Sequence, residues 1–90
     1  MTKLTHVIKR DGNVVPFTPE RITNAIYRAA VAVDGRDKER AENLSAQVVA
    51  ALEESVPEGE YPTIETIQDM VEKVLIENGH ARVAKAYILY

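Results

Sequence analysis

The chain opens with two short apolar stretches and then changes to blocks in which apolar residues recur every three or four positions. Residues 6–9 and 14–17 each read as a short strand. Between them stands Asp11-Gly12, a dipeptide typical of tight hairpin turns because both of its residues tolerate positive φ. The sequence therefore predicts that the chain begins with a β-hairpin.

The first helix is predicted directly after the hairpin. Thr18 stands before Pro19, and a hydroxyl cap followed by proline at the first helical position is a common helix start. The apolar spacing that follows predicts a helix to about Val33, ended by Asp34-Gly35. Its buried stripe would consist of Ile22, Ala25, Ile26, Ala29, Ala30 and Val33.

A second helix is predicted from near Asp37, and a loop rich in Gly, Pro and Glu follows it. The buried side of this helix would be formed by Ala41, Leu44, Val48 and Leu52, and could extend to Val56. The loop covers residues 57–62, where Glu60 and Tyr61 could add a third strand beside the hairpin.

Two further helices are predicted after that loop. Thr63 caps the third helix, and Asn78-Gly79 supplies its left-handed stop. The fourth begins at about His80, and its last residues, AKAYILY, contain no stop signal, so we expect the chain to continue beyond Tyr90. Two or three strands followed by four helices predict a single α+β domain over residues 1–90, in which a small sheet caps a four-helix bundle.

Composition excludes several classes of chemistry. The sequence has no cysteine, which rules out disulfides, thiolate zinc sites and cysteine nucleophiles within it. It also has no unbroken apolar run long enough for a membrane span and no apolar signal segment at its start, so we expect a cytoplasmic protein. Neither a Gly-rich phosphate loop nor a Ser/His/Asp grouping is present.

The net charge of −3 is unevenly distributed. Residues 1–28 hold five basic and two acidic residues, residues 29–79 hold four basic and twelve acidic ones, and the last eleven add Arg82 and Lys85. If the fold brings the two ends together, they would form a cationic pocket on an acidic body. Such a pocket suits a compact polyanion better than a long nucleic acid.

Three basic residues are candidates for that polyanion site. Lys9 and Arg10 flank the predicted turn, where they are either phosphate ligands or a solvated hairpin tip. Arg21 lies in the first turn of a helix, where a basic residue opposes the helix dipole unless an anion is near. His6 and His80 have no metal-ligand spacing, so no protein metal site is predicted, and Mg²⁺ would arrive only with a nucleotide.

Two separated runs resemble one known family. The run VIKRDGNVVPFTPERITNAIYRAA closely resembles the opening of the ATP-cone, in which a Val-x-Lys-Arg-Asp-Gly hairpin precedes an apolar or aromatic residue, a cap and a helix. The run PTIETIQDMVEKVLIENGHARVAKAYILY is similar to the second half of that domain. Together they cover nearly the whole chain, and only residues 36–56 are generic.

This resemblance implies the regulatory domain that ribonucleotide reductases carry at their N-terminus. Its small sheet acts as the lid of a four-helix bundle. The domain binds ATP or dATP, with or without Mg²⁺, and switches reductase activity, usually through a change of oligomeric state. The resemblance therefore implies a domain without catalytic residues whose partners are adenine nucleotides and a reductase catalytic domain, with no role for nucleic acid or membrane.

The resemblance also implies which residues bind the nucleotide. Lys9, Arg10 and Arg21 look like phosphate ligands. The other positions form the lid and the wall of the first helix (Val7, Val15, Phe17, Thr18 and Ile22) or contact adenine and ribose (Ile64, Ile67 and Gln68).

Two other functions are weighed against this one. A nucleotide-responsive transcriptional repressor joins a zinc ribbon to the same cone, but the cysteine-free start, only a few residues before the hairpin, argues against it. A helical interaction or DNA-binding module unrelated to the cone is disfavoured by the acidic charge and by the lack of a basic recognition helix.

Overall fold

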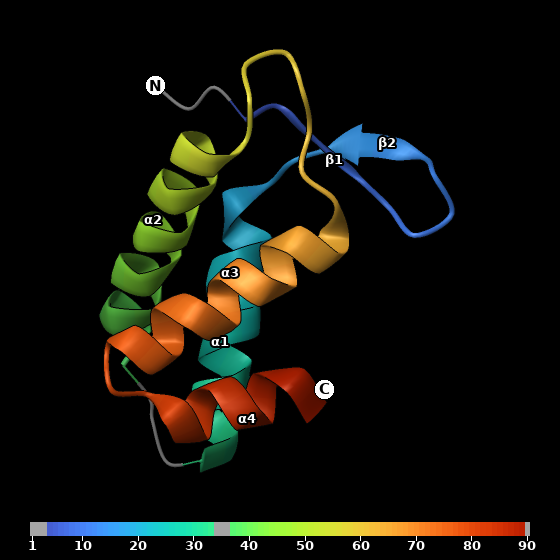
Figure 1. Cartoon of the computed structure of the whole chain (residues 1–90). Helices are drawn as coiled ribbons and strands as arrows, with labels where there is room; N and C mark the ends of the chain where they lie inside the picture. The colour runs from blue at the N-terminus through green and yellow to red at the C-terminus, as the bar shows by residue number, and fades with distance from the viewer. Residues whose placement is uncertain (1–3, 34–36, 90) are drawn as a thin grey trace.

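A hairpin followed by four helices makes up the protein, as a computed structural model shows for residues 4–33 and 37–89 (Figure 1). Asp34-Gly35, predicted to end the first helix, lies outside the described residues. The predicted α+β class is confirmed. The elements are β1 (His6–Ile8), β2 (Val14–Pro16), α1 (Pro19–Val33), α2 (Lys38–Ser55), α3 (Ile64–Glu77) and α4 (Ala81–Leu89).

The four helices form a closed ring around one core. Helix α1 packs against α2 and α4, and α3 packs against the same two neighbours. The apolar stripes predicted from the sequence meet at the centre, where burial of hydrocarbon surface supplies the main driving force for folding. The largest fully buried side chains are Ile26, Val48, Leu52, Val71 and Leu75.

Local capping interactions fix where α2 and α3 begin and where α3 ends. The Asp37 carboxylate accepts the Arg40 N–H at 3.0 Å, and the Thr63 hydroxyl accepts the Thr66 N–H at 3.1 Å. At the end of α3, Gly79 has a φ of 81° and donates its N–H to the Ile76 carbonyl. Together with the His80 N–H to Leu75 carbonyl bond, this forms a Schellman motif, which confirms the predicted left-handed stop.

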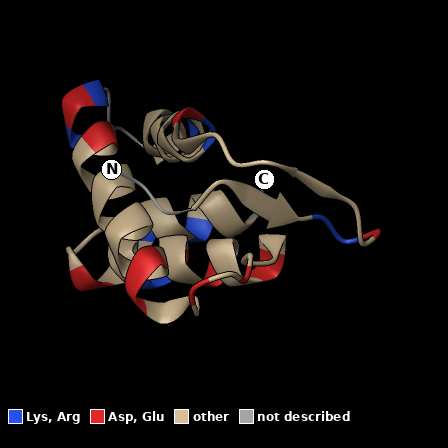
Figure 2. Cartoon of the chain, turned by 90° about the horizontal axis from the view of Figure 1, so that it is seen from above, with Lys and Arg blue, Asp and Glu red and all other residues tan. Residues whose placement is uncertain are grey.

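The predicted hairpin is also confirmed. Its antiparallel strands pair Val7 with Val15, and the Lys9 N–H donates to the Asn13 carbonyl at 2.8 Å. Gly12 takes the positive φ, 88°, and its N–H donates to the Lys9 carbonyl. The Asp11 carboxylate accepts the backbone N–H of Asn13, and this bond lowers the pKa of Asp11. The charged tip of the hairpin projects beyond the helices (Figure 2).

The suggestion of a third strand at Glu60 and Tyr61 is wrong. Those residues form no strand, and β1 makes one parallel bridge with Thr63 instead. The Ile8 N–H donates to the Pro62 carbonyl at 2.9 Å. Strand pairing with β1 cannot extend beyond this bridge, because Pro62 has no N–H to donate on one side and Thr63 already caps α3 on the other. The bridge nevertheless ties β1 to the start of α3, and this contact positions the hairpin over the bundle.

Candidate functional site

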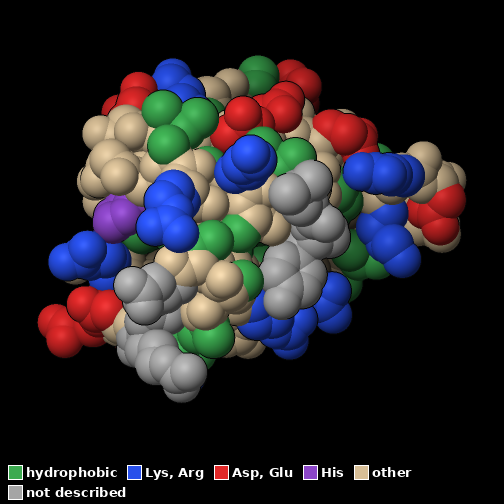
Figure 3. Space-filling model, turned by 90° about the horizontal axis from the view of Figure 1, so that it is seen from below, with side chains coloured by type: hydrophobic (Ala, Val, Ile, Leu, Met, Phe, Trp, Pro, Cys, Tyr) green, Lys and Arg blue, Asp and Glu red, His purple; other side chains and the backbone are tan. Residues whose placement is uncertain are grey.

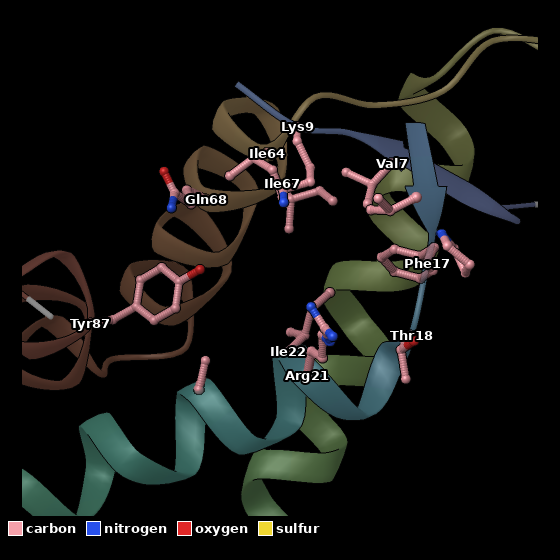
Figure 4. Close-up of a pocket in the computed structure, with 13 residues that line it drawn as sticks. Val7, Lys9, Phe17, Thr18, Arg21, Ile22, Ile64, Ile67, Gln68 and Tyr87 are labelled. Carbon is pink, nitrogen blue, oxygen red and sulfur yellow. The ribbon is translucent and has the colours of Figure 1, made fainter. Parts of the chain in front are cut away.

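A pocket of about 500 Å³ lies between the hairpin, the start of α1, α3 and α4 (Figure 4). Its size falls within the range of small-molecule sites. It brings together residues from both halves of the sequence because β1 is tied to the start of α3 and α1 packs against α4. The lining residues are Val7, Lys9, Val15, Pro16, Phe17, Thr18, Arg21, Ile22, Ala25, Ile64, Ile67, Gln68 and Tyr87.

Ten of the eleven residues predicted from the sequence lie around this pocket. The exception is Arg10, which is not among the lining residues. Its Nε donates to Glu65 Oε1 at 3.2 Å, so its guanidinium is paired with a carboxylate at the first turn of α3. The structure thus separates the two neighbouring basic residues of the hairpin, since Lys9 lines the pocket and Arg10 lies outside it.

One wall of the pocket is apolar and continuous with the core. Val7, Ile22 and Ile67 are buried, and each also belongs to the hydrophobic cluster inside the bundle. Phe17 and Ile64 are half-buried and pack against the same cluster. Because these side chains are held by core packing, the wall is rigid and would offer a flat apolar ligand a preformed contact surface.

The polar groups of the pocket are cationic or neutral. Lys9 comes from the hairpin and Arg21 from the first turn of α1, on the other side of the pocket (Figure 4). Both side chains belong to exposed residues. Among the described residues, no acidic side chain lines the pocket, although the sequence contains fourteen acidic residues. Thr18, which precedes α1, also lines the pocket, so the positive end of the α1 dipole adds to this field.

The cationic pocket expected from the joining of the two chain ends is only partly formed. Lys9 and Arg21 contribute to it, but Arg82 and Lys85 of α4 are not among the lining residues. Viewed from below, Lys and Arg side chains are spread among acidic and hydrophobic ones and form no single cluster (Figure 3). The positive charge at the pocket therefore comes from the hairpin and α1.

The pocket also contains Pro16, Ala25 and Tyr87, which the sequence did not assign to it. Ala25 could have been found from helical spacing, since it lies three positions after Ile22 on the same face of α1. Tyr87 of α4 is half-buried, with its ring in the pocket wall (Figure 4). The sequence signal for Tyr87 was the type of its side chain, because a tyrosine often packs its ring in the wall of a pocket and leaves its hydroxyl at the pocket edge.

Burial raises the pKa of Tyr87, which gives a testable pH dependence. The native state holds this proton more tightly than the unfolded chain does, so its contribution to stability is complete below pH 10.0, the ordinary pKa, and is lost as pH rises through the raised value. We expect urea unfolding between pH 9 and 12 to show a steeper loss of stability for the wild type than for Tyr87→Phe. Parallel curves would contradict this assignment.

Two negative findings hold for the part of the chain that the structure describes. That part contains no group of three or more residues able to hold a metal ion. None of its helices is long and apolar enough to cross a membrane.

Comparison with known proteins identifies the family. The family model described as ATP cone domain matches residues 5–90, so the chain belongs to the ATP-cone family. It is 44% identical over 92 residues to the vitamin B12-dependent ribonucleoside-diphosphate reductase of Thermoplasma acidophilum, covering 97% of this chain and 12% of that protein.

Relatives of other reductase types are similar over the same region. The anaerobic ribonucleoside-triphosphate reductase of Escherichia coli is 40% identical over 85 residues, covering 94% of this chain and 11% of the relative. The ribonucleoside-diphosphate reductase subunit alpha of Chlamydia trachomatis is 39% identical, covering 93% and 9%. The chain thus spans only about a tenth of these relatives. The matches support a nucleotide-binding regulatory role of the kind found with ribonucleotide reductases.

Proposed function

We propose that this domain binds ATP or dATP in the pocket beneath the hairpin and thereby controls the overall activity of a ribonucleotide reductase. The observation that carries the proposal is the pocket itself. Residues from the hairpin, α1 and α3 that were assigned to a nucleotide from sequence alone surround one cavity, with an apolar wall and two cations. A nucleotide has the matching division into a flat base and a polyanionic tail.

The base would lie on the apolar wall. Ile22, Ile64 and Ile67 provide the contact surface, and Gln68 adds a polar amide to the lining. An amide both donates and accepts hydrogen bonds, so it can pair with the polar edge of adenine or with a ribose hydroxyl. The Tyr87 hydroxyl is a second group of this kind in the pocket.

The phosphates would lie between Lys9 and Arg21. Hydrogen bonds between cationic side chains and phosphate oxygens are charge-assisted and stronger than neutral ones. Arg21 stands in the first turn of α1, so a phosphate there would offset the unfavourable interaction of its charge with the helix dipole. Any Mg²⁺ would be held by the phosphates, since the pocket lining offers it no carboxylate.

The role we assign is regulatory and not catalytic. The pocket lining contains Thr18 and Tyr87 hydroxyls but no histidine or carboxylate beside them to act as a general base. The reacting centre would therefore belong to a separate catalytic domain. Nucleotide binding to the cone would change the activity of that domain, and oligomerisation through the cone is one way to do so. We place this protein in the cytoplasm, without nucleic acid or membrane as a partner. The reductase names of its relatives favour this role over a repressor.

Thermal unfolding with and without nucleotide tests the proposal. A ligand that binds only the native state stabilises it, by about 1.4 kcal/mol at ten times Kd. For a domain of this size, that corresponds to a rise in Tm of roughly 5 to 10 °C. We expect ATP and dATP to produce this rise in a concentration-dependent way, with inorganic phosphate at matched ionic strength as the control. An unchanged Tm at millimolar ATP would reject the proposed site.

A further inference from the structure

An ion pair at the edge of the pocket bears on how the phosphates would be bound. Arg10 Nε lies 3.2 Å from Glu65 Oε1, and 55 positions separate the two residues in the sequence. The pair joins the hairpin tip to the first turn of α3. Each partner adjoins a residue that lines the pocket, since Lys9 precedes Arg10 and Ile64 precedes Glu65. Both members of the pair therefore follow a lining residue in the sequence, although neither member lines the pocket itself.

We propose that Glu65 is a positioning residue that sets the affinity for triphosphate by competing with the phosphates for Arg10. This inference rests on the proposed function, because it concerns the regulation of the same site. When a triphosphate binds beside Lys9, Arg10 exchanges the Glu65 carboxylate for a phosphate oxygen. The affinity then reflects the difference between the two interactions and not the phosphate contact alone.

The exposure of the pair makes this exchange easy. The side chains of Arg10 and Glu65 are 75% and 54% exposed, and such solvated pairs are held only weakly. Phosphate is the stronger competitor because a triphosphate carries several negative charges, and a guanidinium can bind it, like a carboxylate, through two parallel hydrogen bonds. Arg10 uses only its Nε in the recorded bond to Glu65, so that pairing is not the two-bond arrangement.

Glu65 loses little when Arg10 leaves it. Its carboxylate is more than half exposed, so water replaces the guanidinium. It also lies in the first turn of α3, where an acidic side chain interacts favourably with the helix dipole. The Glu65 carboxylate can therefore stay charged and solvated whether or not Arg10 is bound to it. A residue that releases Arg10 to a phosphate needs this property.

The hairpin stays in place during the exchange. The Ile8 N–H to Pro62 carbonyl bond and the bridge between Ile8 and Thr63 hold β1 against the start of α3 without Arg10. The turn is closed by the Gly12 N–H to Lys9 carbonyl bond, which does not involve the Arg10 side chain. The proposed step is therefore the rotation of one side chain and not the opening of a lid.

Calorimetric titration of the full chain with ATP and with adenosine tests this competition. Glu65→Gln keeps the size of the side chain and removes its charge. We expect it to tighten ATP binding about two- to fivefold, the range that an exposed ion pair supplies. Adenosine binding should not change, because adenosine has no phosphate. Glu77→Gln is the matched control: it makes the same change in charge at the other end of α3 and should leave ATP affinity unchanged.

The decisive comparison repeats Glu65→Gln in an Arg10→Ala background. If Glu65 acts through Arg10, its replacement has no effect on ATP affinity there. The same gain with and without Arg10 would show general relief of charge repulsion and would overturn the competition, as would an unchanged or weaker affinity in Glu65→Gln alone. A wild type that fails to bind ATP at all would reject the proposed function together with this inference, whereas normal wild-type binding with no Glu65 effect rejects only the inference.

Discussion

Leu75→Ala is expected to destabilise the domain by about 2 to 5 kcal/mol, which is the range for removing a large aliphatic side chain from a packed core. Leu75 is fully buried in α3 and belongs to the central cluster of the helix ring. A domain of this length has a total stability on the order of 5 to 13 kcal/mol, so the loss is a large part of the whole. Urea unfolding of both proteins measures it.

The next residue on the same helix provides the control. Ile76 is 51% exposed, so Ile76→Ala removes surface that is already largely in water, and its cost should be well below that of Leu75→Ala. The two substitutions together test the orientation of α3, which also presents Ile64, Ile67 and Gln68 to the pocket. Equal losses of stability at the two positions would mean that α3 is rotated from the orientation described. The assignment of Ile64, Ile67 and Gln68 to the pocket would then also be wrong.

Replacing either pocket cation should weaken triphosphate binding by at least tenfold. A charge-assisted hydrogen bond is worth roughly 1.5 to 3 kcal/mol, and Lys9→Ala and Arg21→Ala each remove the donor of such a bond. Both residues are exposed, so neither change opens a core cavity, and the fold should stay within about 0.5 kcal/mol of the wild type. Calorimetry with ATP measures the first effect and urea unfolding the second.

Adenosine separates a phosphate contact from a structural role of these residues. Since it carries no phosphate, it should bind Lys9→Ala and Arg21→Ala as tightly as it binds the wild type. Lys38→Ala is the matched control, because it removes a basic residue at the start of α2, outside the pocket lining, and should leave ATP binding unchanged. If Lys9→Ala weakened adenosine and ATP by the same factor, Lys9 would act through the shape of the hairpin and not through its charge.

The helices and the hairpin could be predicted because their signals are local. The stop at Gly79 needs only a residue that accepts positive φ, and the turn at Gly12 needs the same. Apolar spacing of three and four identified the stripe that places Val48 and Leu52 in the core. In each case the residues that decide the structure stand within a few positions of one another.

Contacts between distant parts of the chain could not be predicted. Glu60 and Tyr61 were a plausible strand by composition, but pairing depends on where the chain meets β1, and that contact falls at Thr63. The phosphate role of Arg10 stays a prediction, but its ion pair with Glu65 could not be predicted, because Glu65 is 55 positions away and nothing in either segment indicates the pair. Tyr87 reaches the pocket only because α4 packs against α1, which periodicity within α4 does not reveal.

Titration calorimetry of the full chain with ATP and GTP at one ionic strength tests the central claim, that the pocket beneath the hairpin binds adenine nucleotides. Guanine carries more polar groups than adenine, and a group left unpaired against the apolar wall of Ile22, Ile64 and Ile67 costs about 1 to 3 kcal/mol. The account therefore predicts saturable binding of ATP, about tenfold or more tighter than that of GTP. GTP binding equal to or tighter than that of ATP, or the absence of any heat with millimolar ATP, would contradict it.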